Sequence, residues 1–250
     1  MNDILNSLSL GFFLTFIVAG LVKGVTGMGL PTVAMGLLGL FMPPAAAAAL
    51  LVVPSFVTNV WQLFGGRALG ALLRRFAGLL LGIVAGTLAS ASALAGIDAL
   101  WSGFALGVAL IVYAAWALIA PPLFVSPRTE RWLSPPVGLL TGLVAGVTGV
   151  FVMPAVPYLQ SLQLGRERLI QALGLSFTVS ALSLAGGLLL HGVFQVGQLG
   201  LSALAILPAL AGMWLGQRIR ARISLRTFRL CFLLFLIGLG LELMLRPAFR

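Results

Sequence analysis

The chain has 250 residues, of which 60% are hydrophobic, and only 8% carry a charge, as 15 basic and 5 acidic side chains. A water-soluble domain needs about a quarter of its residues charged, and the mean hydropathy here is +1.14. This composition excludes a soluble enzyme and a disordered protein. The single cysteine, Cys231, excludes a disulfide-stabilised secreted scaffold.

The charged residues are separated by long stretches that contain no Asp, Glu, Lys or Arg. These stretches run over 4–22, 24–66, 76–97, 99–127, 132–165 and 169–217. Since about 20 apolar residues cross a bilayer as a helix, the two longest stretches can each hold two crossings. The pattern predicts an all-α polytopic membrane protein. The net charge of +10 then comes from arginines between spans, which orient the chain in the membrane, and nucleic acid is not an expected partner.

Proline and glycine pairs divide the apolar stretches into ten predicted segments. Those of the first half are 8–22, 28–42, 45–64, 74–93 and 99–120. Those of the second half are 136–149, 150–164, 169–190, 197–216 and 228–246. The first two segments of each half have about 15 residues, which at about 1.5 Å per residue is too short for a 30 Å hydrocarbon core. We expect these segments to be broken or re-entrant at a Gly-rich motif.

A motif occurs once in each half of the chain. Gly20 to Gly27 reads GLVKGVTG, and Gly142 to Gly149 reads GLVAGVTG, so that the two copies differ at one position. Because further proline and glycine matches follow at about the same offset, we interpret the chain as two copies of one unit. The expected division is a first repeat over 1–120, a linker over 121–135 and a second repeat over 136–250.

The arginines alternate between equivalent loops of the two copies. Loop 65–75 has three arginines, whereas its counterpart 191–198 has no formal charge. Loop 92–99 has no arginine, whereas its counterpart 217–229 has five. Short arginine-rich loops stay in the cytoplasm, so an odd number of crossings per copy would place every arginine cluster on one side. The pattern predicts two repeats that are inverted in the membrane, with both termini outside.

Inverted repeats with broken helices are typical of secondary transporters. Glycines around Gly24, with Pro31 close behind, mark where a helix would unwind. The amides freed at the start of a half-helix can bind an anion. We expect the two copies to bring two such sites together near the midplane. The Gly-x-x-x-Gly spacing is also the signature of close helix packing, and this alternative stays open.

Lys23 is the only lysine and lies inside an apolar run. An ionisable group there indicates a functional site, unless the side chain snorkels to the interface. Thr26 and Thr148 lie in the two copies of the motif, and Thr58 and Gln62 are weaker candidates on segment 45–64. The predicted substrate-binding residues are Lys23, Gly24, Thr26, Gly27, Asn59, Gly146, Thr148, Gly149 and Ser180.

Several kinds of active site are not supported by the sequence. No carboxylate occupies the middle of a predicted span, so a proton relay built on buried Asp or Glu is not expected. One His and one Cys cannot form a catalytic metal site, and no Gly-rich phosphate loop is present. We therefore expect no catalytic residue, no metal and no cofactor, and we do not expect an enzyme.

The stretches GLVKGVTGMGLPTVAMGLLGLFMPP and GLVAGVTGVFVMPAVPYLQSLQLGRERLIQALGLSFT resemble the sulfite exporter TauE/SafE family, also described as the four-toluene-sulfonate uptake permease family. The resemblance covers nearly the whole chain. It implies a multi-pass carrier of the bacterial inner membrane, with the outer termini in the periplasm. Family substrates include sulfite, sulfoacetate, other organosulfonates and some organic acids.

The family's glycine motif falls on five positions of this chain, namely Gly24, Gly27, Gly29, Gly146 and Gly149. Many members have a denser glycine run there. This chain has Met28 in the first copy and Val150-Phe151 in the second. The departure implies a second site that is smaller or less polar than the first.

The expected function is that of a secondary transporter of a small anion, such as sulfite or an organosulfonate. The alternatives are an anion channel and a non-transporting membrane component that serves in assembly or sensing. The expected partners are the small anionic substrate and the lipid bilayer, and a homodimer stays open as an assembly.

Overall fold

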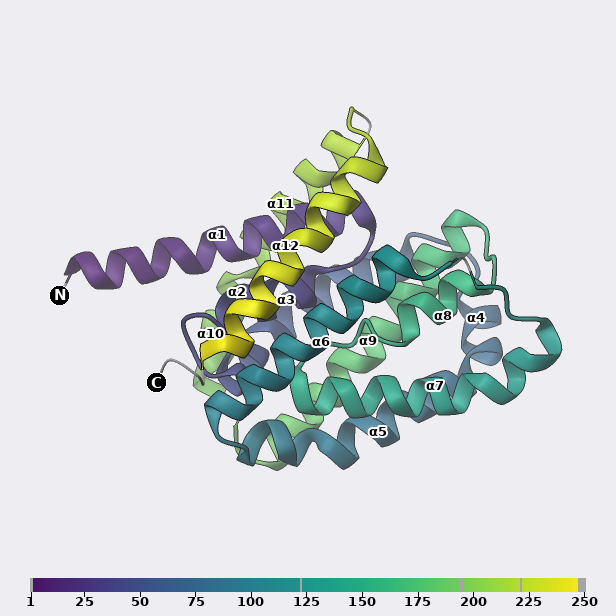
Figure 1. Ribbon diagram of the computed structural model, residues 1–250, viewed down its shortest axis with the longest axis horizontal. Coiled ribbons are helices and arrows are strands. Elements are labelled where there is room, and N and C mark those ends of the chain that lie inside the picture. The colour runs from purple at the N-terminus through teal and green to yellow at the C-terminus, as the bar shows by residue number, and fades with distance from the viewer. Residues whose placement is uncertain (1, 122, 194–195, 221, 247–250) are drawn as a thin grey trace.

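The computed structural model describes residues 2–121, 123–193, 196–220 and 222–246, and within them the side chains of 10–121, 123–193, 200–220, 222–224 and 226–246. Small parts of the predicted linker, of two predicted loops and of both chain ends therefore lie outside the described residues. The first half contains α1 (Asn2–Thr26), α2 (Leu30–Leu38), α3 (Pro44–Phe64), α4 (Leu69–Arg75), α5 (Ala77–Gly96) and α6 (Ala99–Ile119) (Figure 1). The second half contains α7 (Pro127–Thr148), α8 (Ala155–Ser161), α9 (Arg166–Leu190), α10 (Val196–Leu204), α11 (Ile206–Arg220) and α12 (Leu225–Leu245).

Six helices in the described part of the chain are long and apolar enough to cross a membrane. They are Pro44–Phe64, Ala77–Gly96, Ala99–Ile119, Arg166–Leu190, Gly200–Arg220 and Arg226–Leu245. The α1 helix adds a shorter apolar stretch, Leu10–Thr26. The prediction of an all-α polytopic membrane protein is confirmed.

The first helix of each half is longer than the sequence pattern predicted. Helix α7 begins at Pro127 rather than at 136, with the side chain of Ser126 accepting a hydrogen bond from the Thr129 N–H. Proline is favoured in the first turn, where its missing N–H has no partner to lose. Pro135 lies inside the helix, where its ring packs against the open face of Gly78 on α5. This contact with a neighbouring helix accommodates a residue that usually ends a helix.

Helices are exchanged between the two halves, which means that a helix of one half packs against a helix of the other. Helix α1 packs on α11 of the second half, and α7 packs on α5 of the first half, each as a parallel pair. Helices α3 and α9 pack together, as do α6 and α12, and the partners in these two pairs run in opposite directions (Figure 1). Such an exchange of equivalent helices is what an internal two-fold relation between the halves would produce.

Glycines bring the exchanged helices into close contact. Gly20 and Gly24 lie against the backbone of α11, and Gly142 and Gly146 lie against the backbone of α5. A Cβ atom at any of these four positions would overlap main-chain or side-chain atoms of the facing helix. These residues therefore have the role that the packing interpretation of the Gly-x-x-x-Gly spacing assigned to them.

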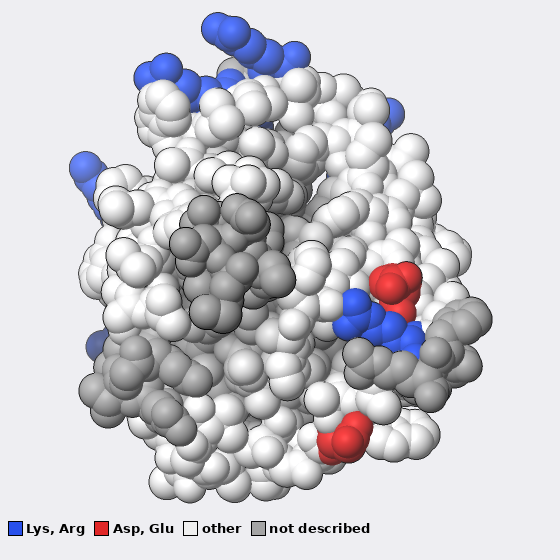
Figure 2. All heavy atoms as spheres, turned by 90° about the vertical axis from the view of Figure 1, so that its left-hand side faces the viewer, with Lys and Arg blue, Asp and Glu red and all other residues white. Residues whose placement is uncertain are grey.

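The arginine-bearing connections gather at one end of the molecule, at the upper right of Figure 1. We call this the arginine-rich end. The opposite end, which we call the terminal end, has both described chain ends on its side and shows few charged side chains (Figure 2). At the arginine-rich end Arg75 binds Glu130 through Nε at 2.6 Å and Nη2 at 2.7 Å, and this hydrogen-bonded carboxylate raises the pKa of Arg75. The ion pair fastens α4 of the first half to α7 of the second.

Replacing the first glycine of either motif copy tests the packing of the exchanged pairs. We expect Gly20→Ala and Gly142→Ala to lower the melting temperature in detergent, because overpacking costs about 1–3 kcal/mol. Gly103→Ala on α6, where a Cβ meets nothing within 4 Å, is the matched control and should keep or raise the melting temperature. Equal melting temperatures in all three variants would contradict a role of Gly20 and Gly142 in close helix packing.

Candidate functional site

Helix α1 ends in a short break before α2 begins. Gly27 and Gly29 have φ angles of 81° and 100°, in the left-handed region that favours glycine. The Thr26 hydroxyl lies 2.9 Å from the Val22 carbonyl and accepts a hydrogen bond from the Met28 N–H at 3.2 Å. Thr26 therefore turns the chain out of the helix with its own side chain.

The second copy of the motif ends α7 in the same way. The Thr148 hydroxyl donates to the Val144 carbonyl at 2.7 Å and accepts from the Val150 N–H at 3.2 Å. Gly149 follows with a φ angle of 72°. The repeated threonine thus has a local structural reason to be present in both copies, because each one supports a break in the backbone.

Lys23 lies one turn before the first break and is only 1% exposed. Its Nζ donates to Thr58 Oγ1 at 3.1 Å and to Asn59 Oδ1, both on α3. Neither partner is charged. Within the described residues the acidic side chains that form ion pairs are bound to arginines, so Lys23 has no carboxylate partner there. The lysine is held in the interior and does not snorkel to the interface.

Asn59 has an amide group that is not used. An ammonium group can only donate hydrogen bonds, so the oxygen of Asn59 faces Lys23 and the NH₂ group points elsewhere. That Nδ2 atom is buried without a hydrogen-bond partner, in a side chain that is 0% exposed. An unpaired buried donor is costly. Lys23 and Asn59 together provide a cation and free N–H donors at one point, which suits an oxyanion.

A line of polar side chains runs along α3 through this point. Ser55, Asn59 and Gln62 have the spacing that places residues on one face of a helix. Gln62 Nε2 donates to the Gly27 carbonyl at 2.6 Å and so ties α3 to the break. Its Oε1 and the Ser55 hydroxyl are buried without partners. The polar line therefore extends from the first break past Lys23 toward the middle of α3.

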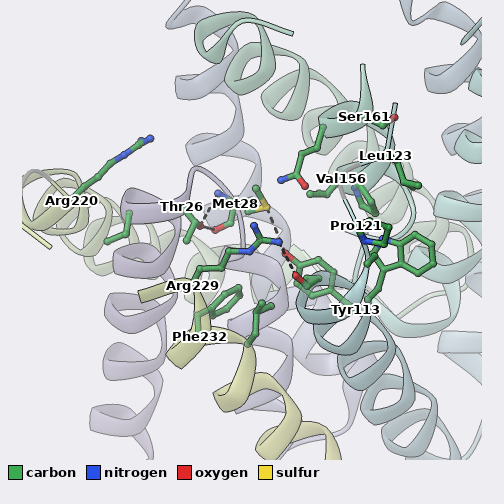
Figure 3. Close-up of a pocket in the computed structure, with 17 residues that line it drawn as sticks. Thr26, Met28, Tyr113, Pro121, Leu123, Val156, Ser161, Arg220, Arg229 and Phe232 are labelled. Carbon is green, nitrogen blue, oxygen red and sulfur yellow. Dashed lines mark hydrogen bonds between the residues drawn. The ribbon is translucent and has the colours of Figure 1, made fainter. Parts of the chain in front are cut away.

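A cavity of about 420 Å³ lies beside the first break, between α1, α6, α8, α11 and α12. Thr26, Met28 and Tyr113 line it together with Arg229, which extends from α12 toward the Ala117 carbonyl and donates to it at 2.8 Å (Figure 3). The Tyr113 hydroxyl lies 3.6 Å from the Met28 sulfur. The cavity thus combines aromatic and apolar walls with two cationic side chains, Arg220 and Arg229, and its nearest α1 residue, Val25, is two residues from Lys23.

The two breaks do not meet near the midplane, in contrast to the expectation from the sequence. The first break contacts Gln62, near the end of α3, whereas Gly149 of the second break faces Ala48, near its start. These contacts are fourteen residues apart, or about 20 Å along the helix axis. Since α1 and α7 run in opposite directions and each is long, their ends stop on opposite sides of the middle.

The predicted site residues therefore divide into groups. Lys23 and Asn59 are in contact, Thr26 lines the adjacent cavity, and the Gly27 carbonyl binds Gln62. Gly24 and Gly146 lie in helix contacts, as described above. Thr148 and Gly149 belong to the second break, and Ser180 is buried on α9, where it donates to the Ser176 carbonyl at 2.9 Å.

Sequence analysis missed polar groups that line the cavity, among them Arg220, Arg229 and Tyr113. The arginines of 217–229 were interpreted only as signals of orientation, because nothing in their spacing separates one that faces a cavity from one that faces water. Ser55 was also missed. Its spacing from Asn59 and Gln62 is the signal that could have revealed it.

Removing either motif threonine tests its structural role. We expect Thr26→Val and Thr148→Val to destabilise the protein by a similar amount, about 1–2 kcal/mol, because each leaves a backbone N–H unpaired. Thr141→Val is the control, since the Thr141 hydroxyl only donates to the Val137 carbonyl within α7. Thermal unfolding in detergent measures all three, and a control as unstable as the other two would refute this role.

Comparison with known proteins identifies the family of the chain. The family model described as Sulfite exporter TauE/SafE matches residues 12–243. Comparisons with curated proteins and with solved structures found no match. The family match covers nearly all of the chain, including both copies of the glycine motif and the cavity between the halves, and it confirms the resemblance noted in the sequence. The chain belongs to the sulfite exporter TauE/SafE family of membrane transporters.

Proposed function

We propose that the chain is a secondary transporter of a small anion, such as sulfite or an organosulfonate, and that the anion binds at Lys23 and Asn59. The observation that carries this proposal is a lysine buried in the membrane part of the protein with only neutral partners. Membership of a sulfite exporter family supports the same substrate class.

Electrostatics favours an anion at this point. A buried charge without a counter-charge is unfavourable, and attraction between opposite charges is strong where the dielectric constant is low. The described surroundings of Lys23 supply hydroxyl and amide groups but no carboxylate. A bound anion would pair with the ammonium group of Lys23 and accept hydrogen bonds from the free N–H groups of Asn59. A cationic substrate would be repelled.

The cavity reaches Val25 and Thr26, two and three residues along α1 from Lys23, and its lining includes neither Lys23 nor a residue of α3. We propose that an anion attracted by Arg229 at the arginine-rich end passes from this cavity to Lys23. Arginine-rich loops remain in the cytoplasm, so we place this end in the cytoplasm of a bacterial cell and both termini in the periplasm. In this orientation the cavity is the cytoplasmic entrance.

Two alternatives remain to be separated from a carrier. An anion channel would give flux that does not saturate and would show no counter-exchange. A non-transporting assembly or sensor component would give no anion-dependent flux. The exchange of helices between two related halves favours the carrier, because transporters of this kind rock one unit against the other around a central site.

Changing Asn59 tests the anion site. We expect Asn59→Asp to lower the initial rate of sulfite or organosulfonate uptake into proteoliposomes by about tenfold or more, because the new carboxylate pairs with Lys23 and repels the substrate. A charge-assisted hydrogen bond contributes about 1.5–3 kcal/mol, and each 1.4 kcal/mol is about a factor of ten. Lys23→Ala, which copies Ala145 of the second motif, should lower the rate similarly.

Arg131→Ala is the matched control, because it also removes one positive charge but from an exposed position on α7. It should leave the initial rate unchanged. If Lys23 had a purely structural role, Asn59→Asp would preserve both the melting temperature and transport. Unchanged transport in Asn59→Asp and Lys23→Ala would therefore refute the assignment of the anion site to Lys23 and Asn59.

A further inference from the structure

We propose that Met35, Phe151 and Phe177 form a closed apolar gate between the Lys23–Asn59 site and the terminal end of the molecule. This inference rests on the proposed function, since it describes how the anion site is sealed on one side. It assigns the second copy of the motif a role different from that of the first.

The two breaks have the same motif but different surroundings. The first break lies beside the cavity of about 420 Å³, which Thr26 and Met28 line. The second break is enclosed by protein, because Val150, Phe151 and Val152 are each at most 1% exposed. A Cβ atom on Gly149 would lie 2.7 Å from the end of the Met35 side chain. The chain is therefore packed tightly at the second break, where the first break has open space.

An aromatic pair closes the second break. The rings of Phe151 and Phe177 have centroids 5.4 Å apart and planes at 55°, and both side chains are buried. One ring comes from the break itself and the other from α9. Tilted aromatic contacts of this kind are favourable beyond the area that they bury. The pair joins the break after α7 to the helix that packs against α3.

Helix packing places Phe177 just beyond the anion site. Gly174 of α9 contacts α3 at Asn59 and Leu63, and the two helices are antiparallel. Phe177, three residues further along α9, therefore lies level with the next turn of α3, toward Ser55. This direction leads away from the cavity and toward the terminal end. The aromatic pair is thus on the opposite side of the site from the entrance.

The polar line on α3 also stops at this level. Beyond Ser55, the buried residues of α3 toward its start are all apolar, namely Pro54, Leu51, Ala49, Ala48, Ala47 and Pro44. An anion that moved past Ser55 would leave the polar line of α3 and meet the buried side chains of Met35, Phe151 and Phe177. Apolar constrictions of this kind block ions because water does not enter them. The gate must open before the anion can leave at the terminal end.

Thiol labelling tests the seal without requiring a transported anion. In a Cys231→Ser background, Ser55→Cys places a reporter between the anion site and the gate, and a membrane-impermeant maleimide is added on the side of the terminal end. We expect Phe151→Ala and Phe177→Ala to raise the labelling rate by about tenfold or more, which corresponds to about 1.4 kcal/mol. Phe177→Val, which removes less volume, extends the test if the alanine variants fail to fold.

Phe76→Ala is the control for general loosening, because Phe76 is equally buried but lies at the junction of α4 and α5. It should leave the labelling rate unchanged. The gate proposal is refuted if Ser55→Cys is labelled as fast with both aromatic rings intact as it is in the Phe151→Ala and Phe177→Ala variants. It is also refuted if Phe76→Ala accelerates labelling as much as those variants do.

Flux measurements separate this inference from the proposed function. With wild-type protein in proteoliposomes we expect saturable uptake of sulfite and counter-exchange, and with Phe151→Ala we expect faster uptake that no longer saturates. Faster labelling without any wild-type flux of sulfite or organosulfonate would support the gate and refute the transporter. Saturable exchange in wild type and in both alanine variants would support the transporter and refute the gate.

Discussion

A single lysine that cannot reach water places the strongest constraint on this structure. The ammonium group of Lys23 needs hydrogen-bond acceptors inside the membrane, and α3 supplies them through Thr58 and Asn59. This contact joins α1 to α3. The same face of α3 carries the unused Asn59 amide and Gln62, which binds the break that follows. The site and the fold around it are therefore parts of one arrangement of polar groups.

The sequence predicted the spanning helices well, because apolar length and charge are direct signals of a membrane crossing. Segments 45–64 and 169–190 differ by at most three residues from α3 and α9 at either end. The start of α7 was missed, since proline pairs were interpreted as helix ends. Pro135 instead packs against Gly78 on α5, and such tertiary compensation leaves no mark in the local sequence.

The candidate site was predictable in its parts but not in its arrangement. An isolated lysine and a polar residue such as Asn59 can each be selected from an apolar chain by composition alone. Their contact depends on which helices are neighbours, and periodicity does not provide that information. The same limit explains why the two motif copies were expected to meet. The shared motif makes Thr26 and Thr148 end their helices with the same hydrogen bond, but the surroundings of each break come from other parts of the chain.

The exchange of helices between the halves has a consequence for how the protein is made. Helix α1 is synthesised well before α11, the helix against which its glycine face fits. Until then that face has only lipid or a temporary neighbour to contact. Neither half holds a complete set of its own contacts, so insertion of individual helices has to precede their assembly, and the interior can close only after the second half has entered the bilayer.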